Sequence, residues 1–415
     1  MDLCKRRGAI KIYWVYASEH GRLESIRVHA TSPDPAMAPA KGPKPPKYLY
    51  PRIWHAMHMA HMRFSTSGGS PSDVMVKAGN PARLDYIDVA KGLGIVLVVI
   101  GHIWPGTLKL FIFCFHMPLF FVLSGFLFKP SAPGAYLSRK TVHLLVPYAA
   151  SLALLVLIAP KPHLETLLDS AEYSHPLLMV LYGGQHLVTY AGTFWFLSCL
   201  WFTQQLFNLQ LRWSSVRALP WIALGCYLLS LADQHWLGRP FPWALNVSLA
   251  VIPFFVFGYL IRTIRSTPVW SLVLSGAILA AGYVLVAKMG YSASLNLKNT
   301  FYGIPFVSLL IALAGAWFIL GVSRLVATFR GVSSFFQLLG SASLFILLFH
   351  QFINLRVSYT RFADNLPLRA VLALGIPLVV FVVGRRFSLF RALFLGSNHD
   401  FALWRNRAVH LLRRA

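Results

Sequence analysis

Hydrophobic positions from about residue 84 onward fall into ten continuous runs separated by polar or basic connections. Each run has about 15–23 mostly apolar residues, enough for an α-helix to cross the ~30 Å hydrocarbon layer of a bilayer. Because polar and apolar residues do not alternate within the runs, the pattern predicts helices and not the strands of a membrane barrel. The sequence therefore predicts an all-α, polytopic membrane bundle of about ten transmembrane helices. The runs are 84–104, 108–128, 142–159, 193–211, 218–232, 243–261, 268–287, 300–322, 335–353 and 368–384.

The distribution of Lys and Arg predicts how these helices are oriented. From residue 81 onward there are 26 such residues, and 18 of them fall on the cytoplasmic side if the amino terminus is placed there. Cytoplasmic segments of membrane proteins carry an excess of Lys and Arg, and an even number of spans agrees with this placement. We expect both termini in the cytoplasm and the protein in the inner membrane of a bacterial cell.

Composition supports a membrane protein and argues against a nucleic-acid-binding one. The chain is 56% hydrophobic and 12% charged, whereas soluble domains have about 25% charged residues. The formal net charge of +25 would suggest nucleic acid in a soluble protein. Here the basic residues lie between apolar runs, where they determine topology. We therefore expect a lipid bilayer as partner and no nucleic acid; the oligomeric state stays open.

Three regions differ in composition. Residues 1–80 carry 12 Lys and Arg, Pro-rich stretches and no run of spanning length. We expect them to form a disordered, basic, cytoplasmic extension, with a true translation start as late as Met75 as an open alternative. Residues 81–390 are expected to form the ten-helix domain, and residues 391–415 a basic cytoplasmic tail.

The first apolar run contains three residues that are costly in lipid. A charged side chain within a span costs roughly 2.5–3.5 kcal/mol, so each one needs a partner or a function. Lys91 and His102 are eleven positions apart, which places them on one face of a helix with about 16 Å of rise between them. Asp88 lies one turn before Lys91 and is expected to pair with it. The alternative is a lysine at the membrane surface and a satisfied buried histidine. Three glycines of this run allow a second helix or a ligand to approach closely: Gly92, Gly94 and Gly101.

The second run also contains a histidine, His116, two residues before Pro118. Pro118 is expected to kink the helix because it lacks a backbone N–H. If the short turn after the first run pairs the two helices antiparallel, His102 and His116 lie at similar depth. Two facing imidazoles can provide a base and its partner, or hold a metal with Cys114 or a carboxylate as a further ligand, or bind haem. We expect the base and no metal.

Several motifs resemble the acyltransferase 3 family of integral-membrane acyltransferases, and most closely its fucose 4-O-acetylase-like branch. The leading motif is a basic residue, ten further residues and then a histidine. In this chain the basic residue is Lys91, at the end of RLDYIDVAK, and the histidine is His102, which follows Gly101. It is followed by FHMPLFFVLSGFLF from Phe115 to Phe128, by the Arg139–Lys140 pair, by GTFWFL around Trp195, and by LGSASL before His350.

This resemblance covers about residues 81–384. It implies a ten-helix fold that takes an acyl group from cytoplasmic acyl-CoA and transfers it to a sugar hydroxyl at the outer side. Lys91 matches the basic position of the motif, where arginine is common, and His102 matches the catalytic histidine. A lysine at that position does not offer a bidentate phosphate contact.

The residues allow this chemistry. Acyl transfer to an alcohol needs a base near neutral pH, and imidazole has a suitable pKa. We expect His102 and His116 to be catalytic. We expect Lys91, Arg139 and Lys140 to bind the phosphates of the donor, acyl-CoA and most simply acetyl-CoA, whose pantetheine arm would follow the glycine-rich face of the first helix. No bound cofactor is expected.

Three further residues are expected to support the site: Asp88, Trp195 and His350. The alternatives for them stay open, since Trp195 also suits an interfacial aromatic belt and Arg139 and Lys140 also suit topology determinants alone. The competing function is a transporter or flippase for a lipid-linked glycan, which would need charges at mid-depth in several spans. The sequence does not identify the acceptor sugar or glycan or the acyl chain, or whether an acyl-histidine forms.

Overall fold

The computed structural model describes residues 11–12, 28–29, 85–158, 182–264 and 266–412. The chain divides into two units, Met1–Arg83 and Leu84–Ala415. In the first unit, β1 (Lys11–Ile12) and β2 (Val28–His29) pair antiparallel, with Lys11 opposite His29. The expected disorder of residues 1–80 otherwise concerns residues outside the described ranges.

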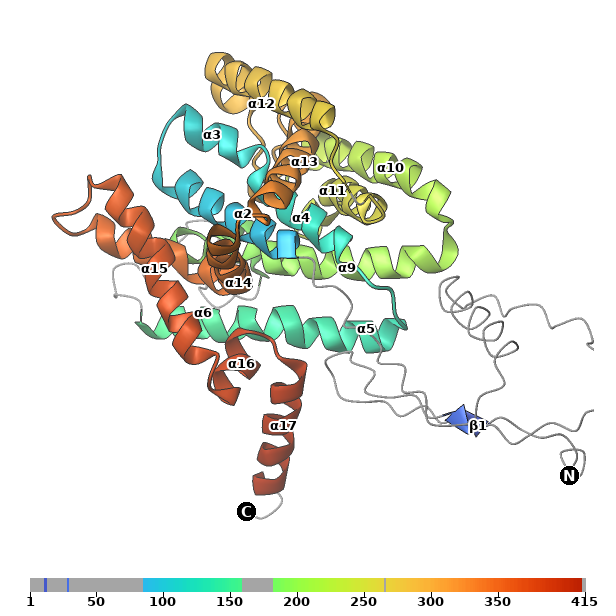
Figure 1. The fold of residues 1–415 in the computed structure, drawn as a ribbon, viewed down its shortest axis with the longest axis vertical. Coiled ribbons are helices and arrows are strands. Elements are labelled where there is room, and N and C mark those ends of the chain that lie inside the picture. Colours follow the sequence, from blue (N-terminus) through green and yellow to red (C-terminus); the bar gives the residue numbers. More distant parts are fainter. Residues whose placement is uncertain (1–10, 13–27, 30–84, 159–181, 265, 413–415) are drawn as a thin grey trace, which may run out of the picture. The chain divides into compact units, whose positions relative to one another are not determined.

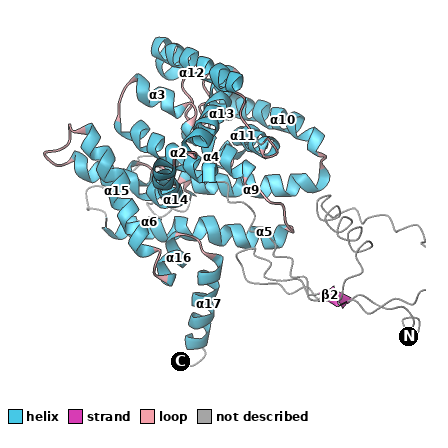
Figure 2. Ribbon diagram, in the orientation of Figure 1, coloured by secondary structure: helices cyan, strands magenta, loops and turns pink. Residues whose placement is uncertain are grey.

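The second unit is a bundle of helices, and Figure 2 shows that its described part is almost entirely helical. Short 3₁₀ and π turns connect the long helices: η1 (Thr141–Leu145), η2 (Gly184–His186), η3 (Thr189–Ala191), η4 (Val216–Ala218), η5 (Asp233–Leu237), η6 (Pro242–Ala244), η7 (Gly290–Ala293) and η8 (Leu297–Asn299). The α-helices, most of them labelled in Figure 1, are α2 (Asp85–Ile103), α3 (Thr107–Phe113), α4 (His116–Phe126), α5 (Pro133–Lys140), α6 (Val146–Ile158), α9 (Trp195–Trp213), α10 (Leu219–Ala232), α11 (Val247–Ile261), α12 (Val269–Met289), α13 (Val307–Val326), α14 (Arg330–Ser358), α15 (Leu366–Gly384), α16 (Ser388–Phe394) and α17 (Asn398–Leu412).

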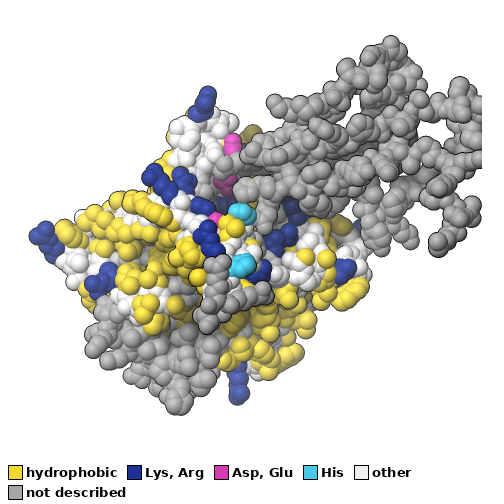
Figure 3. All heavy atoms as spheres, turned by 90° about the horizontal axis from the view of Figure 1, so that it is seen from below, with side chains coloured by type: hydrophobic (Ala, Val, Ile, Leu, Met, Phe, Trp, Pro, Cys, Tyr) yellow, Lys and Arg dark blue, Asp and Glu magenta, His cyan; other side chains and the backbone are white. Residues whose placement is uncertain are grey.

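The prediction of a polytopic helical membrane bundle is confirmed. Within the described ranges, nine helical stretches are long and apolar enough to cross a membrane. Large hydrophobic side chains are exposed on their outer surfaces, among them Trp221 (74% exposed), Val273 (67%) and Val371 (64%). Figure 3 shows broad hydrophobic areas on one face, with Lys and Arg side chains gathered between and around them. Such a surface is stable only against lipid.

The fourth predicted run, 193–211, corresponds to α9, which is not among the nine because its second half carries polar amides. Two of these amides, Gln204 and Asn208, bond to α5 and the residues just before it. The Tyr136 hydroxyl donates to Gln204 Oε1 at 3.4 Å, and Asn208 exchanges two hydrogen bonds with the backbone of Ser131, at 3.0 and 3.1 Å. Polar side chains that bond across helices are tolerated inside a membrane bundle. Helix α9 is therefore less apolar because one of its faces is buried against protein.

The packing of α2 on α14 agrees with α9 as a further crossing helix. A Cβ on Gly92 would overlap the Phe336 carbonyl, and a Cβ on Gly340 would overlap the Asp88 carbonyl. Ten residues after these two glycines, the rings of His102 and His350 lie 5.1 Å apart. The two helices therefore run parallel. Helices that alternate in direction make the first and ninth parallel, which agrees with counting α9 as the fourth.

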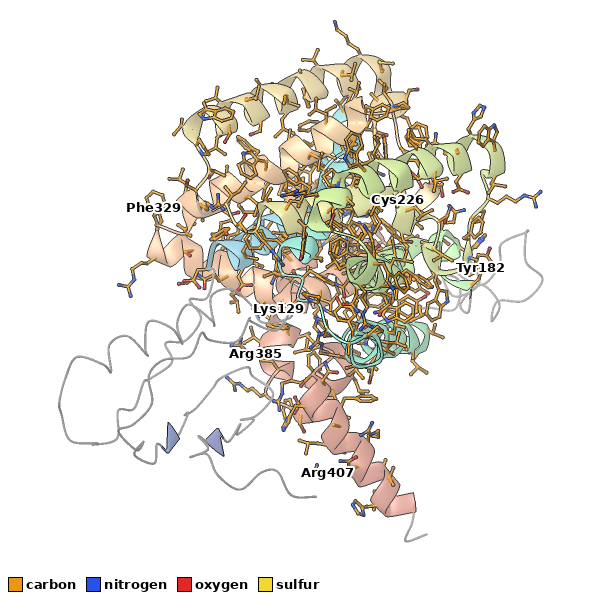
Figure 4. The ribbon with its side chains drawn as sticks, turned by 90° about the vertical axis from the view of Figure 1, so that its right-hand side faces the viewer. Lys129, Tyr182, Cys226, Phe329, Arg385 and Arg407 are labelled. Carbon is orange, nitrogen blue, oxygen red and sulfur yellow. The ribbon has the colours of Figure 1, made fainter. Side chains whose placement is uncertain are left out.

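The ends of the helices agree with this count. In Figure 4, Phe329, which joins α13 to α14, lies at one edge of the bundle, and Tyr182, which precedes α9, lies at the opposite edge. Helix α2 runs between these two sides, which we call the Lys91 end and the His102 end after the residues that α2 places toward each.

The second predicted run, 108–128, corresponds to one membrane-spanning stretch, Thr107–Phe126, with a break one turn before Pro118. It is interrupted at Cys114 and Phe115, between α3 and α4, and Pro118 lies in the first turn of α4. The first N–H groups of a helix have no intrahelical partner, so a residue without an N–H costs little there. The interruption therefore accommodates the proline and places His116 at the start of a new helix.

Residues 388–412, which include most of the predicted tail, form α16 and α17 in this unit. Arg391 joins the two helices through two hydrogen bonds to Asp400, Nε to Oδ2 at 2.8 Å and Nη2 to Oδ1 at 2.7 Å. The Ser397 hydroxyl donates to the same carboxylate at 2.6 Å. In Figure 1 these helices lie below the rest of the bundle.

Candidate active site

Three histidines from three helices meet within the bundle. His102 lies near the end of α2, His116 at the start of α4 and His350 in the second half of α14. The ring centroid of His102 is 5.1 Å from that of His350 and 6.1 Å from that of His116, with nearly perpendicular ring planes. The structure thus brings together the two histidines predicted to be catalytic and the one predicted to support them, with His102 in contact with both others.

Each of these rings is anchored to a backbone carbonyl one turn earlier in the chain. Nδ1 of His102 lies 2.8 Å from the Val98 carbonyl, Nδ1 of His116 lies 2.9 Å from that of Ile112, and Nδ1 of His350 lies 3.0 Å from that of Ile346. A carbonyl oxygen only accepts hydrogen bonds, so Nδ1 carries the proton and donates it. In a neutral ring the Nε2 atom then has the lone pair. All three histidines therefore offer Nε2 as an acceptor.

The three rings differ in exposure. His350 is 0% exposed, and its Nε2 has no hydrogen-bond partner among the described residues. His116 is 3% exposed, whereas His102 is only partly buried. His102 is therefore the member of this cluster with surface left for a substrate.

Cys114, one of the further ligands considered for a metal site, bonds to backbone carbonyls instead. Its thiol lies 3.4 Å from the Leu110 carbonyl and 3.9 Å from that of Ala293. In the part of the chain that the structure describes, no group of three or more His, Cys, Asp or Glu is arranged to hold a metal ion.

Basic residues gather at the Lys91 end. Lys91 Nζ is 3.1 Å from Asp88 Oδ1, the ion pair that the spacing predicted, and the two side chains are 27% and 19% exposed. The Arg139 guanidinium and the Lys140 ammonium lie over the Tyr136 ring, 5.4 and 5.6 Å from its centroid. Their charges and that of Lys91 act on the ring of His143. Arg139 also donates to the Ser131 hydroxyl at 3.3 Å.

His143 was missed by the sequence analysis, although it follows Lys140 by only three residues. It lies in η1, a π turn between α5 and α6, and its Nδ1 is 3.3 Å from the Gly396 carbonyl. Single π turns within helices occur frequently at functional sites. A histidine so close to a predicted basic pair is the signal that could have identified it.

The glycine-rich face of α2 is filled by protein. Gly92 faces the Phe336 backbone of α14, Gly94 faces Leu119 and Phe120, and Gly101 faces Ile112. Ile95 and Val98, which lie between Lys91 and His102 on the same stripe of the helix, are 0% exposed. The expected path for the pantetheine arm along this face is therefore wrong for this structure, because glycines there admit neighbouring helices instead. A donor that reaches His102 from Lys91 needs another path or a separation of α2 from α14.

Trp195, the remaining predicted supporting residue, lies in the first turn of α9 and is 5% exposed. This burial places it inside the bundle and away from a lipid-facing aromatic belt. Just before it, the Thr193 hydroxyl donates to the Leu347 carbonyl at 2.9 Å. The start of α9 is thus fastened to α14 three residues before His350.

Lys298 is a second residue that the sequence analysis did not single out. Its Nζ donates to the Leu187 carbonyl at 2.6 Å, and its charge acts on His102 together with that of Lys109. Burial lowers the pKa of Lys298 to about 8. The loops near it hold strained backbone, which clusters at functional sites. Among the described residues other than glycine with positive φ, Thr189, Trp243, Ala244 and Thr300 lie in or beside these loops, and Phe306 is the fifth.

Comparison with known proteins gives one match. The family model of the acyltransferase 3 family, described as an acyltransferase domain, matches residues 84–386, which is most of the chain. No curated protein and no solved structure shows significant similarity to the chain. The matched region contains all three histidines and the basic residues at the Lys91 end.

Proposed function

The chain belongs to the acyltransferase 3 family and is a membrane acyltransferase, and we propose that it moves an acetyl group from acetyl-CoA to a hydroxyl of a sugar or cell-surface glycan, with His102 as general base. The observation that carries this proposal is the state of the His102 ring. Its Nδ1 is committed to the Val98 carbonyl, and its Nε2 accepts a proton. It is also the histidine of the cluster that is partly exposed.

The reaction uses that nitrogen twice. The acceptor hydroxyl gives its proton to Nε2 of His102 while its oxygen attacks the thioester carbonyl. The C–S bond then breaks, and the CoA thiolate leaves and takes the proton back from the imidazolium. His116, whose ring is 6.1 Å away and nearly perpendicular, fixes the orientation of the His102 ring. The products are an acyl ester of the acceptor and free CoA.

The donor is expected at the Lys91 end. CoA carries several phosphate charges, and clustered Lys and Arg side chains attract and bind such groups. Arg139 and Lys140 lie over the same Tyr136 ring, and their charges and that of Lys91 act on His143. The excess of Lys and Arg on this side supports a cytoplasmic location, where acyl-CoA is made. The acceptor then approaches from the His102 end, where Lys298 and the strained loops lie.

The test is an acyl-transfer assay on the purified protein in detergent or vesicles. Acetyl-CoA is supplied with a panel of glycosides, thiol release is followed, and the acetylated product is identified by mass spectrometry. His102→Ala should abolish transfer without changing expression or thermal stability. His410→Ala, a histidine exposed on α17, is the matched control and should behave as the unchanged protein.

Near-normal turnover by His102→Ala would refute the role of His102. Uptake or flipping of a labelled glycan with no acetyl transfer would support the transporter alternative instead.

A further inference from the structure

We propose that His102 and His350 together recognise a pair of neighbouring hydroxyl groups on the acceptor, one hydroxyl on each Nε2, so that the enzyme selects vicinal diols. This inference rests on the proposed function, because it assigns the chemical class of the acceptor at the same site. His350 has the least exposed ring of the three.

His350 holds a buried acceptor that the protein does not satisfy. Its ring is 0% exposed, its Nδ1 is 3.0 Å from the carbonyls of both Ile346 and Leu347, and its Nε2 has no partner among the described residues. Buried polar atoms of native proteins nearly always have a hydrogen-bond partner, and leaving one unpaired is costly. The missing partner must be a donor.

The neighbouring histidine does not provide that donor. The one N–H of the neutral His102 ring is committed to the Val98 carbonyl at 2.8 Å. Its Nε2 is therefore an acceptor as well, and two acceptors cannot bond to each other. His116, with its Nδ1 bound to the Ile112 carbonyl, is in the same state. The three Nε2 atoms are therefore all hydrogen-bond acceptors, and none of the three rings has an N–H left to donate to another.

A ligand that satisfies His102 and His350 at once needs two donors side by side. The two ring centroids are only 5.1 Å apart. A single hydroxyl has one proton, and in the proposed reaction that proton goes to His102. A hydroxyl on the adjacent carbon provides the second proton for His350. Vicinal hydroxyls are the defining feature of carbohydrates, whereas simple alcohols lack them.

His350 is therefore a binding residue that orients the acceptor. The hydroxyl that bonds to His350 holds its neighbour against His102, which limits acylation to one position of the sugar ring. A site built to bond a hydroxyl strongly rejects an analogue that lacks it, because a buried polar atom is then left unpaired.

The experiment compares acceptors that differ by one hydroxyl. Methyl glycosides of common hexoses are tested with acetyl-CoA, each beside the two deoxy analogues that lack one hydroxyl next to the acetylated position. For the unchanged protein we expect one of the two analogues to lose ~10-fold or more in kcat/KM. In His350→Ala the diol should react more slowly, and the difference in kcat/KM between the diol and the deoxy analogue should disappear. His350→Gln, whose Oε1 still accepts a hydrogen bond, should keep part of that difference, and His410→Ala should keep all of it.

The outcomes separate the two proposals. Transfer to none of the glycosides would contradict the proposed function. Transfer to the diol and to both deoxy analogues at equal rates would overturn the inference, because a water molecule would then satisfy both rings. An unchanged preference in His350→Ala would also overturn it. The comparison of the diol with its deoxy analogues uses the unchanged protein. It therefore still tests the inference if a His350 variant fails to fold.

Discussion

A single methyl group added at Gly340 should separate the two helices that hold the site. Gly340 lies where α14 touches α2, ten residues before His350, and Gly92 on α2 lies ten residues before His102. A Cβ at Gly340 would overlap the Asp88 carbonyl oxygen and lie 2.8 Å from the Asp88 carbonyl carbon. Because backbone atoms and not a flexible side chain oppose it, the helices must move.

The size of the effect follows from these contacts. Carbon atoms in contact are normally about 3.5–4.0 Å apart, so α2 and α14 must separate by about 1 Å. Overpacking of this kind costs about 1–3 kcal/mol, which exceeds the gain of about 1 kcal/mol in helix propensity on replacing glycine by alanine. A misplacement of about 1 Å between reacting groups costs on the order of 10²-fold in rate. Gly340→Ala should therefore lose about 100-fold in kcat.

The assay is acetyl transfer from acetyl-CoA, with thermal unfolding measured on the same samples. Gly375→Ala is the matched control, because Gly375 lies within α15 and a Cβ there meets no atom within 4 Å. That variant should keep its activity and gain slightly in stability. If Gly340→Ala retained activity within threefold and unfolded at the same temperature, the close packing of α2 on α14 would not position the site.

Three further predictions concern the charged groups. Lys91→Ala should raise KM for acetyl-CoA by ~10-fold with little change in kcat, as expected for a phosphate contact, and steady-state kinetics measure both. Lys298 has its pKa lowered to about 8 by burial, so the unfolded chain binds more protons between pH 8 and about 10.4. Thermal scans should show stability rising with pH over that interval, and Lys298→Met should remove the rise. Arg391, through its hydrogen bonds, lowers the pKa of Asp400 to about 2, so the α16–α17 joint should weaken as pH falls from about 4 to 2. Arg391→Ala should weaken it at neutral pH, visible as faster hydrogen exchange in α17.

The elements that carry the fold were predictable because lipid imposes a simple rule on the sequence. A bilayer requires long apolar runs, and the runs that became α2, α11, α13 and α15 stand out for that reason. The pairing of Lys91 with Asp88 and the approach of His102 to His116 followed from helix geometry and a short turn. Helix α9 was also found, although its buried amide face makes it less apolar than the others.

What could not be predicted depends on contacts between distant segments. That α14 packs against α2 at Gly92 depends on Gly340, a residue far along the chain whose partner is not encoded nearby. The position of His143 among the basic residues depends on a π turn, which local propensity does not signal. The charge of Lys298 acts on His102 because the loop before α13 lies at that end of the bundle, where Lys298 donates to the Leu187 carbonyl.

The parallel packing of α2 on α14 also bears on how the protein is made. Helix α2 leaves the ribosome well before α14, since the chain between Ile103 and Arg330 separates them. During that interval its polar groups have no partner on α14, yet Asp88 neutralises Lys91 within the same helix and the Val98 carbonyl holds the His102 proton. The first segment thus enters the bilayer already compensated. Catalytic competence arises only when the ninth segment inserts, so nascent chains that stop earlier should be membrane-integrated but inert.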